Sequence, residues 1–103
     1  MIITITQEHP KHAEAIENLL DMAFGLDRYD RPSYFLRTGI QPEHTLCFVA
    51  HNTKTLIGSI RFWPIYIPGT GTGLLLGPIA VDKKYSGHQI GSRLINKGIN
   101  AAR

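Results

Sequence analysis

The residues best suited to chemistry lie near the C-terminal end, between an apolar run and a helical pattern. Leu74–Val81 is nearly continuous apolar sequence, and a polar segment containing Gly87 and Gly91 separates it from a stretch with a basic flank. The first turn of a helix offers unpaired backbone N–H groups and the positive end of its dipole, which together stabilise a phosphate. The arrangement therefore predicts an anion site, although an ordinary strand-to-helix turn fits the spacing equally well.

A second glycine cluster favours a different structure. Gly69, Gly71 and Gly73 alternate ahead of a predicted strand, and the Gly-Lys-Ser/Thr sequence of a phosphate-binding loop does not follow them. Neither a P-loop nor a dinucleotide-binding fingerprint is supported, because both lead into a helix. We interpret this segment as a flexible connection at the tip of a hairpin.

The positive charge of the chain is concentrated at one end. Residues 1–81 hold six basic and seven acidic residues, whereas residues 82–103 hold five basic residues against Asp82 alone. Such a field suits a small phosphorylated ligand or nucleic acid. No aromatic-interleaved basic stretch accompanies it, so nucleic-acid binding is disfavoured, and a solvated basic helix face stays the first interpretation.

Composition narrows the remaining classes of protein. The chain has 103 residues, 43% of them hydrophobic, which suits one globular domain. No apolar run is long enough to cross a bilayer, and the start does not resemble a signal peptide. Cys47 has no partner for a disulfide and is expected to be a buried packing residue, while His9 and His12 lack a third metal ligand. We therefore expect a cytoplasmic protein with no metal and no membrane contact.

Periodicity predicts the elements that must position the glycine-containing turn. Alternating residues predict a strand over 2–6, and helical spacing after Pro10 predicts a helix that ends at Gly25. Ser33 is expected to cap a short second helix to about Arg37.

The second half predicts a hairpin, a third strand and a last helix. Thr45–His51 and Thr55–Tyr66 form the hairpin, with a bulge or edge segment at Pro64. Leu74–Val81 is a strand broken only by Gly77-Pro78, and because it is apolar on both faces it should be covered by helices on both sides. The order of elements is β-α-α-β-β-β-α.

The residues around the turn resemble a known motif. Leu75–Asp82 followed by Tyr85–Ile95 is similar to the acetyl-CoA-binding motif of the GNAT N-acetyltransferase superfamily. The resemblance implies an α/β fold with a mixed, mostly antiparallel sheet flanked by helices, truncated after the pyrophosphate-binding helix, so that residues 1–103 form a single, partial N-acetyltransferase domain. It implies acetyl-CoA as co-substrate.

The same resemblance implies which residues bind the cofactor. The backbone of Ile79–Val81 would hold the pantetheine arm, and the N–H groups of Ile79 and Ala80 would face the thioester oxygen. The pyrophosphate would lie on the loop and first helical turn. The implied cofactor-binding residues are Ile79, Ala80, Val81, Ser86, Gly87, His88, Gln89, Ile90, Gly91 and Ser92.

This sequence departs from the family pattern in two ways. Ser86 replaces a long polar residue and Gln89 replaces a glycine of Q/R-x-x-G-x-G/A, so only Gly91 matches. A positive φ at Gln89 would cost on the order of 1 kcal/mol relative to glycine.

The second departure is length, because family members continue past the last helix with a further strand and a helix that carries a general-acid tyrosine. We therefore expect little or no activity from the 103-residue chain, and self-association into a homo-oligomer through the open edge of Leu74–Val81.

The implied reaction is acetyl transfer to a primary amine of a small molecule or a protein, but no catalytic residue is assigned. No Asp or Glu lies between Thr53 and Val81. Arg61, Trp63 and Tyr66 could line an acceptor pocket, with a structural role preferred for Trp63, and the charged residues at 27–31 could contact the acceptor or be solvated. The alternative function is a non-catalytic CoA-binding or self-assembling fragment.

Overall fold

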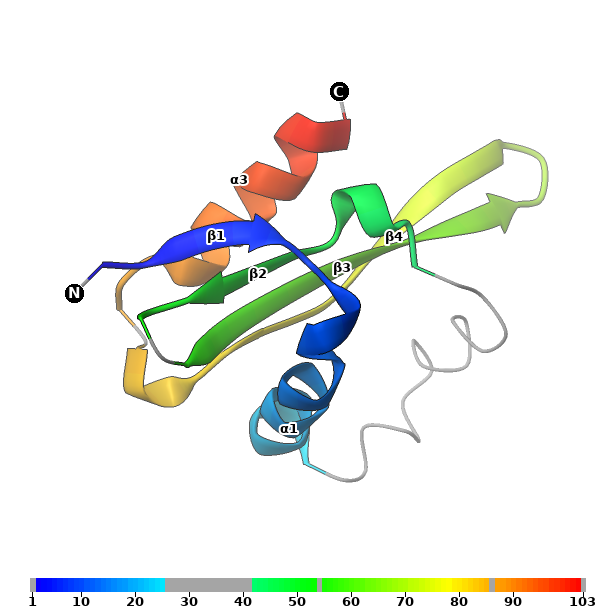
Figure 1. Ribbon diagram of the computed structural model, residues 1–103. Helices are drawn as coiled ribbons and strands as arrows, with labels where there is room; N and C mark the ends of the chain where they lie inside the picture. Colours follow the sequence, from blue (N-terminus) through cyan, green and yellow to red (C-terminus); the bar gives the residue numbers. More distant parts are fainter. Residues whose placement is uncertain (1, 26–41, 54, 86, 103) are drawn as a thin grey trace.

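Four antiparallel strands, two α-helices and three short 3-10 helices make up the regular structure of the described residues. The computed structural model describes residues 2–25, 42–53, 55–85 and 87–102. The sheet has the strand order β1-β2-β3-β4, and α1 and α3 lie on opposite faces (Figure 1). No described helix has the length and apolar character needed to span a membrane. The bounds are β1 Thr4–Gln7, α1 Ala13–Phe24, β2 Phe48–His51, β3 Leu56–Ile67, β4 Gly71–Val81 and α3 Ile90–Ala102, with 3-10 helices η1 Pro10–His12, η3 His44–Leu46 and η4 Lys83–Tyr85.

Two separate cores hold the helices on the sheet. Under α1 the buried residues are Ile16, Leu19, Leu20, Val49 and Ala80. Under α3 they are Leu46, Phe48, Ala50, Ile57, Ile60, Phe62, Ile90 and Leu94. Side chains alternate along a strand, so Ala80 joins the first core while Ile79 and Val81 pack against the second. The predicted α/β fold is confirmed. The prediction that helices cover both sides of this strand is confirmed at residues 79–81.

Several predicted boundaries shift. The helix expected after Pro10 begins as η1, and α1 follows directly. Thr45 lies in η3, so the predicted strand over Thr45–His51 begins only at Phe48. The flexible connection is shorter than expected, because β4 begins at Gly71 and the tip is confined to a tight turn. The predicted helix Ser33–Arg37 and the charged run at 27–31 lie outside the described residues.

The bulge is not at Pro64, where it was predicted. Pro64 pairs with Leu74 in an uninterrupted stretch of the β3–β4 ladder, and the register shifts instead between Ile60 and Phe62. The backbone N–H of Glu43 donates to the Phe62 carbonyl on the side of β3 that faces away from β4. Since hydrogen-bonding directions alternate, the Pro64 nitrogen also faces away from β4, so the proline removes no bond from that ladder.

Candidate functional site

The end of β4 presents backbone groups at an open edge. The N–H of Asp82 donates to the Ile57 carbonyl at 2.8 Å, which makes these two residues a hydrogen-bonded pair. Pairing alternates in an antiparallel ladder, and Ala80 lies opposite Ser59, so Ala80 also directs its N–H and C=O toward β3. Ile79 and Val81 must then direct theirs outward, away from β3.

No strand among the described residues pairs with this outer edge, since β4 is the last strand of the sheet. The outward groups of Ile79 and Val81 are placed to pair with an extended ligand, as an added strand would. This changes one sequence-based expectation. Ile79 keeps its outward N–H, but the Ala80 N–H is used inside the ladder, so Val81 provides the second outward donor in its place.

A bulge precedes the outward-facing amides. Between the pairs Ile60–Ile79 and Phe62–Leu76, β3 contributes one residue and β4 contributes two, Gly77 and Pro78. The Trp63 indole N–H donates to the Gly77 carbonyl and holds this segment against β3. The preferred structural role of Trp63 agrees with this contact.

The turn after β4 is held by side chains that the sequence reasoning did not single out. The Asp82 carboxylate accepts from the Lys84 N–H at 3.0 Å, and the Asp82 carbonyl accepts from the Tyr85 N–H at 2.9 Å. Asn52, in the turn between β2 and β3, donates to the Tyr85 hydroxyl at 2.9 Å. No local pattern links Asn52 with Tyr85, because the contact depends on how the two turns meet in space.

The start of α3 has the geometry expected of an anion site. Gly87 and Gln89 both have positive φ, at 88° and 59°, and Ser86 lies outside the described residues. The Arg93 N–H donates to the Gln89 carbonyl at 3.0 Å, which closes the first helical turn. The N–H groups of residues 90–92 precede that bond and have no carbonyl one turn earlier within the helix. Gln89 therefore has the positive φ that was expected to cost on the order of 1 kcal/mol relative to glycine.

Gly91 lies in this turn, close to the end of β4. A Cβ built at Gly91 would lie 3.9 Å from its nearest neighbours, the side chains of Ile79 and Val81, which is ordinary contact. Packing within the protein therefore does not demand glycine here. The same contacts show that the first turn of α3 packs close to the end of β4, at the side chains of Ile79 and Val81.

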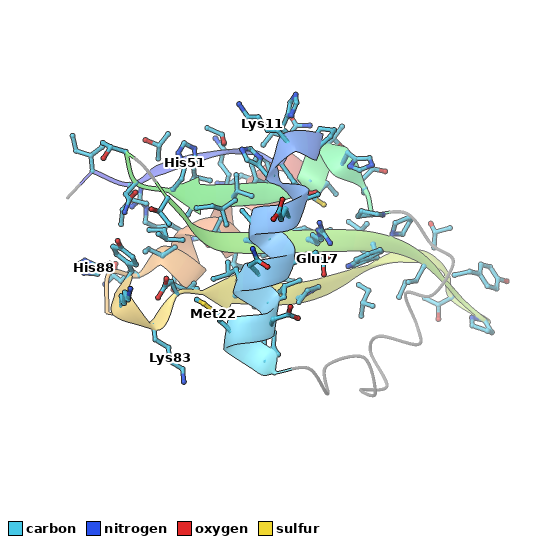
Figure 2. All side chains as sticks on the ribbon, turned by 60° about the horizontal axis from the view of Figure 1, so that its bottom comes forward. Lys11, Glu17, Met22, His51, Lys83 and His88 are labelled. Carbon is cyan, nitrogen blue, oxygen red and sulfur yellow. The ribbon has the colours of Figure 1, made fainter. Side chains whose placement is uncertain are left out.

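The electrostatics of this end favour an anion. The first turn of α3 has no acidic residue, and exposed Lys83 and Lys84 lie in the preceding turn. Figure 2 shows Lys83 and His88 at the same end of the molecule. The helix dipole adds a partial positive charge at the same place.

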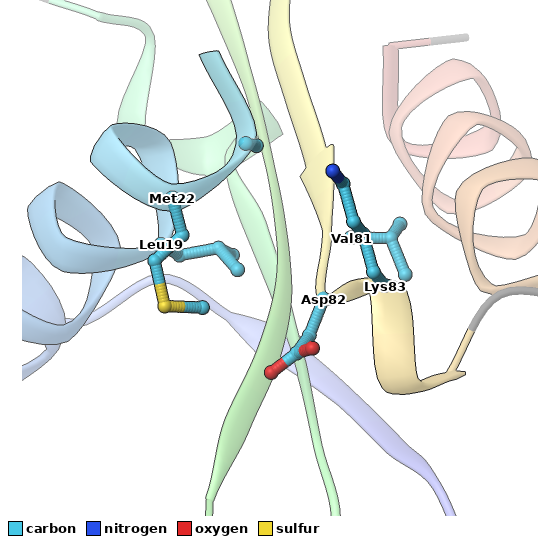
Figure 3. A pocket seen from close by; sticks show the side chains of 6 residues that line it. Leu19, Met22, Val81, Asp82 and Lys83 are labelled. Carbon is cyan, nitrogen blue, oxygen red and sulfur yellow. The ribbon is translucent and has the colours of Figure 1, made fainter. Parts of the chain in front are cut away.

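A small hollow lies where the C-terminal end of α1 meets the end of β4 (Figure 3). Its volume is about 80 Å³, and it is lined by Leu19, Met22, Ala23, Val81, Asp82 and Lys83. A site for a whole nucleotide cofactor occupies several hundred Å³, roughly 300 to 1,000. The hollow is thus at most an extension of the open edge.

Arg61 and Tyr66, the other candidates for an acceptor pocket, lie away from the edge of β4. The Arg61 guanidinium binds Glu8 at 3.0 Å and lies 3.9 Å from Glu17 of α1, so it links β3 with the N-terminal segment and the helix above it. Figure 2 shows Glu17 on α1 over the sheet. Tyr66 is 72% exposed near the hairpin tip, away from the bulge. These two residues do not meet the β4 edge to form a pocket.

Cys47 and the two N-terminal histidines also have local roles. Cys47 is buried, as predicted; burial raises the pKa of its thiol, whose sulfur donates to the Glu43 carbonyl at 3.3 Å. His9 and His12 cap η1 through their ring nitrogens, and partial burial lowers the pKa of His12. In the described part of the chain no cluster of three or more potential metal ligands occurs.

Comparison with known proteins gives this geometry a context. The model of the acetyltransferase (GNAT) family matches residues 13–103. No curated protein matches the chain.

Solved structures with the same fold include complexes with the cofactor. The GNAT family N-acetyltransferase YhbS from Escherichia coli, in complex with CoA, aligns over 96% of this chain with a TM-score of 0.75 and 28% identity. A GNAT family acetyltransferase from Brucella melitensis, in complex with acetyl-CoA, aligns over 96% with a TM-score of 0.73 and 25% identity. The chain spans 55% of the first protein and 67% of the second.

A more distant structure shares the fold alone. Naa50 from Arabidopsis thaliana, in complex with a bisubstrate analogue, aligns over 95% of this chain with a TM-score of 0.68 and 17% identity. The present chain spans 62% of it.

Proposed function

Because this chain belongs to the GNAT acetyltransferase family, we propose that it binds acetyl-CoA along the outer edge of β4 and at the start of α3, and serves acetyl transfer to a primary amine. The observation that carries the proposal is the adjacency of two features. The outward amides of Ile79 and Val81 lie on the strand that leads into the N-terminal turn of α3, and the side chains of these two residues pack near Gly91 in that turn.

Each part of the edge has a distinct role in this proposal. The N–H groups of residues 90–92 hold the pyrophosphate, with Gly87, His88 and Gln89 forming the preceding loop and Ser86 at its start. The outward groups of Ile79 and Val81 pair with the amides of the pantetheine arm. The Ile79 N–H, next to the bulge, is the donor placed to stabilise negative charge that develops on the thioester oxygen. Ala80 contributes by fixing the register of the strand.

The bound co-substrate would supply an acetyl group already activated as a thioester. The acceptor amine must lose a proton to attack it, and β3 and β4 carry no carboxylate for that task. Glu8 and Glu17 are engaged with Arg61. This observation favours the second candidate function for the isolated chain, a CoA-binding fragment without transfer, and we propose that its own turnover is weak or absent.

Calorimetry with CoA and a thiol-release assay with acetyl-CoA separate the candidates. A panel of small primary amines and of peptides with free N-termini covers both acceptor classes, and neither class is favoured by the described residues. We expect measurable CoA binding with little thiol release. Turnover at the rate of ordinary enzymes would contradict the fragment hypothesis, and absence of binding at millimolar CoA would contradict both.

We also propose that the open β4 edge supports a homo-oligomer. Leu74 and Leu76 are 45% and 43% exposed on β4, and Gly71–Val81 carries no charged side chain that would oppose pairing with another chain. Pairing through this edge would use the outward groups of Ile79 and Val81, so saturating CoA should shift the chain toward monomer in light scattering. A monomer at every concentration would overturn this proposal.

The single-domain division and the cytoplasmic location stay predictions from the sequence.

A further inference from the structure

A groove between α3 and β1 is not used by the proposed acetyl-CoA site. It has a volume of about 410 Å³ and is lined by Ile5, Arg93, Asn96, Lys97 and Asn100. The four helical residues recur at intervals of three, one and three, which places them on one face of α3. β1 and β4 are opposite edges of the sheet, so the groove and the acetyl-CoA site lie at different edges.

The groove is cationic without a compensating acid. Arg93 donates to the Ile3 carbonyl at 3.4 Å, and the Lys97 ammonium lies 6.0 Å from the centre of the Phe48 ring. None of the lining residues is acidic, and neither cation is paired with a carboxylate in the described part of the chain. Asn96 and Asn100 add amide donors and acceptors, so the groove suits an anionic partner that also offers polar backbone groups.

The neighbouring edge of β1 is open to pairing. The Glu8 N–H donates to the Cys47 carbonyl at 2.8 Å and continues the β1–β2 register, in which Thr6 lies opposite Val49. Hydrogen-bonding directions alternate, so Thr6 faces β2 while Ile5 directs its N–H and C=O outward. The contact from Arg93 to the carbonyl of Ile3, two residues before Ile5, agrees with this direction.

We propose that this groove binds an acidic peptide segment in extended conformation, which adds to the outer edge of β1 as a further strand. Its backbone pairs with Ile5, and acidic side chains on its α3 side meet Arg93 and Lys97. A free strand edge beside an apolar residue favours a peptide over a nucleic acid or a small phosphate, because those ligands have no use for outward peptide groups and would be held by the two cations alone.

The test uses the 103-residue chain and a capped peptide of alternating glutamate and valine, followed by two-dimensional amide NMR. We expect the peptide to shift the Ile5 amide and the side-chain amides of Asn96 and Asn100, and to slow exchange of the Ile5 amide proton. The same peptide with lysine in place of glutamate should cause neither change. No shift at millimolar acidic peptide, or equal shifts with the lysine peptide, would overturn the proposal.

Paired variants locate the contact. The double variant Arg93→Gln/Lys97→Gln should bind the acidic peptide about fivefold more weakly, as expected for two exposed ion pairs. The matched control Lys11→Gln/Lys84→Gln removes the same charge elsewhere and should bind like the parent. If both variants lose the same affinity, or if oligothymidylate or inorganic phosphate shifts the Ile5 amide as strongly as the peptide, the groove is not a peptide site.

Discussion

The two ends of α3 use glycine for opposite reasons. Near the C-terminal end, a Cβ at Gly98 would lie 2.3 Å from Cε2 of Phe62, so the helix can approach β3 only because this side chain is missing. At the N-terminal end, a Cβ at Gly91 would lie 3.9 Å from its neighbours and disturb nothing in the protein. The contrast indicates that packing requires glycine at position 98 but not at position 91, where the proposed CoA site gives glycine a reason.

The largest effect on stability should come from Gly98→Ala. The new methyl group would overlap the buried Phe62 ring, and overpacking of this kind costs about 1–3 kcal/mol. Urea unfolding should show a lower free energy of unfolding. The double variant Gly98→Ala/Phe62→Leu provides the control, because it should lose less than the two single variants together. An unchanged midpoint for Gly98→Ala would mean that α3 is not held as closely as described.

Gly91→Ala should leave stability intact and weaken CoA binding, the reverse of what is expected for Gly98→Ala. The free energy of unfolding should stay the same or rise, by up to about 1 kcal/mol, because alanine favours a helix. CoA affinity should fall about tenfold, since the methyl group obstructs a charge-assisted bond between phosphate and backbone. Calorimetry and urea unfolding on the same sample check both parts. Unchanged affinity would remove the functional explanation of Gly91.

Gln89→Gly sharpens the comparison at the helix start. Gln89 has φ 59°, and glycine adopts this conformation more readily, by on the order of 1 kcal/mol. We expect a modest gain in stability, and tighter CoA binding if the Gln89 side chain crowds the phosphates. A loss of stability would show that the Gln89 side chain makes a compensating contact in the folded protein.

The smallest predicted effect concerns the buried thiol of Cys47. Burial raises its pKa above the value in the unfolded chain, so the folded state holds the proton longer. Its contribution to stability is therefore complete below the unfolded pKa and declines as pH rises toward the folded pKa. As pH rises above about 8.5, the ordinary pKa of a cysteine thiol, the stability of the parent should fall more than that of Cys47→Ala. Equal slopes would mean that the thiol does not titrate differently on folding.

The sequence predicted the elements around the site well because their patterns are local. The side chains of Ile79, Ala80 and Val81 alternate between the two cores, and the glycine-containing turn leads into an amphipathic helix at Ile90 as expected. The sequence indicated a break in the strand at Gly77 and Pro78, but the bulge was predicted at Pro64, which carried the stronger local signal. Which proline disturbs a ladder depends on which side its nitrogen faces, and that is set by the register with the neighbouring strand.

The features of the site that the sequence did not predict depend on contacts between segments that are distant along the chain. The hydrogen bond from the Asp82 N–H to the Ile57 carbonyl fixes the strand register, and this register makes Val81 rather than Ala80 the second outward donor. The types of these residues do not reveal that register. The partners of Arg61 are likewise set by how α1 and β1 lie over β3.

Titration of the isotopically labelled chain with CoA, followed by amide NMR, tests the central claim most directly. If the ligand lies along the outer edge of β4 and at the start of α3, the amides of Ile79, Val81 and residues 87–92 should shift first and furthest. The amides around Gly98 and in the hairpin tip should move little. No shifts at millimolar CoA, or shifts centred on the groove beside β1, would contradict the account.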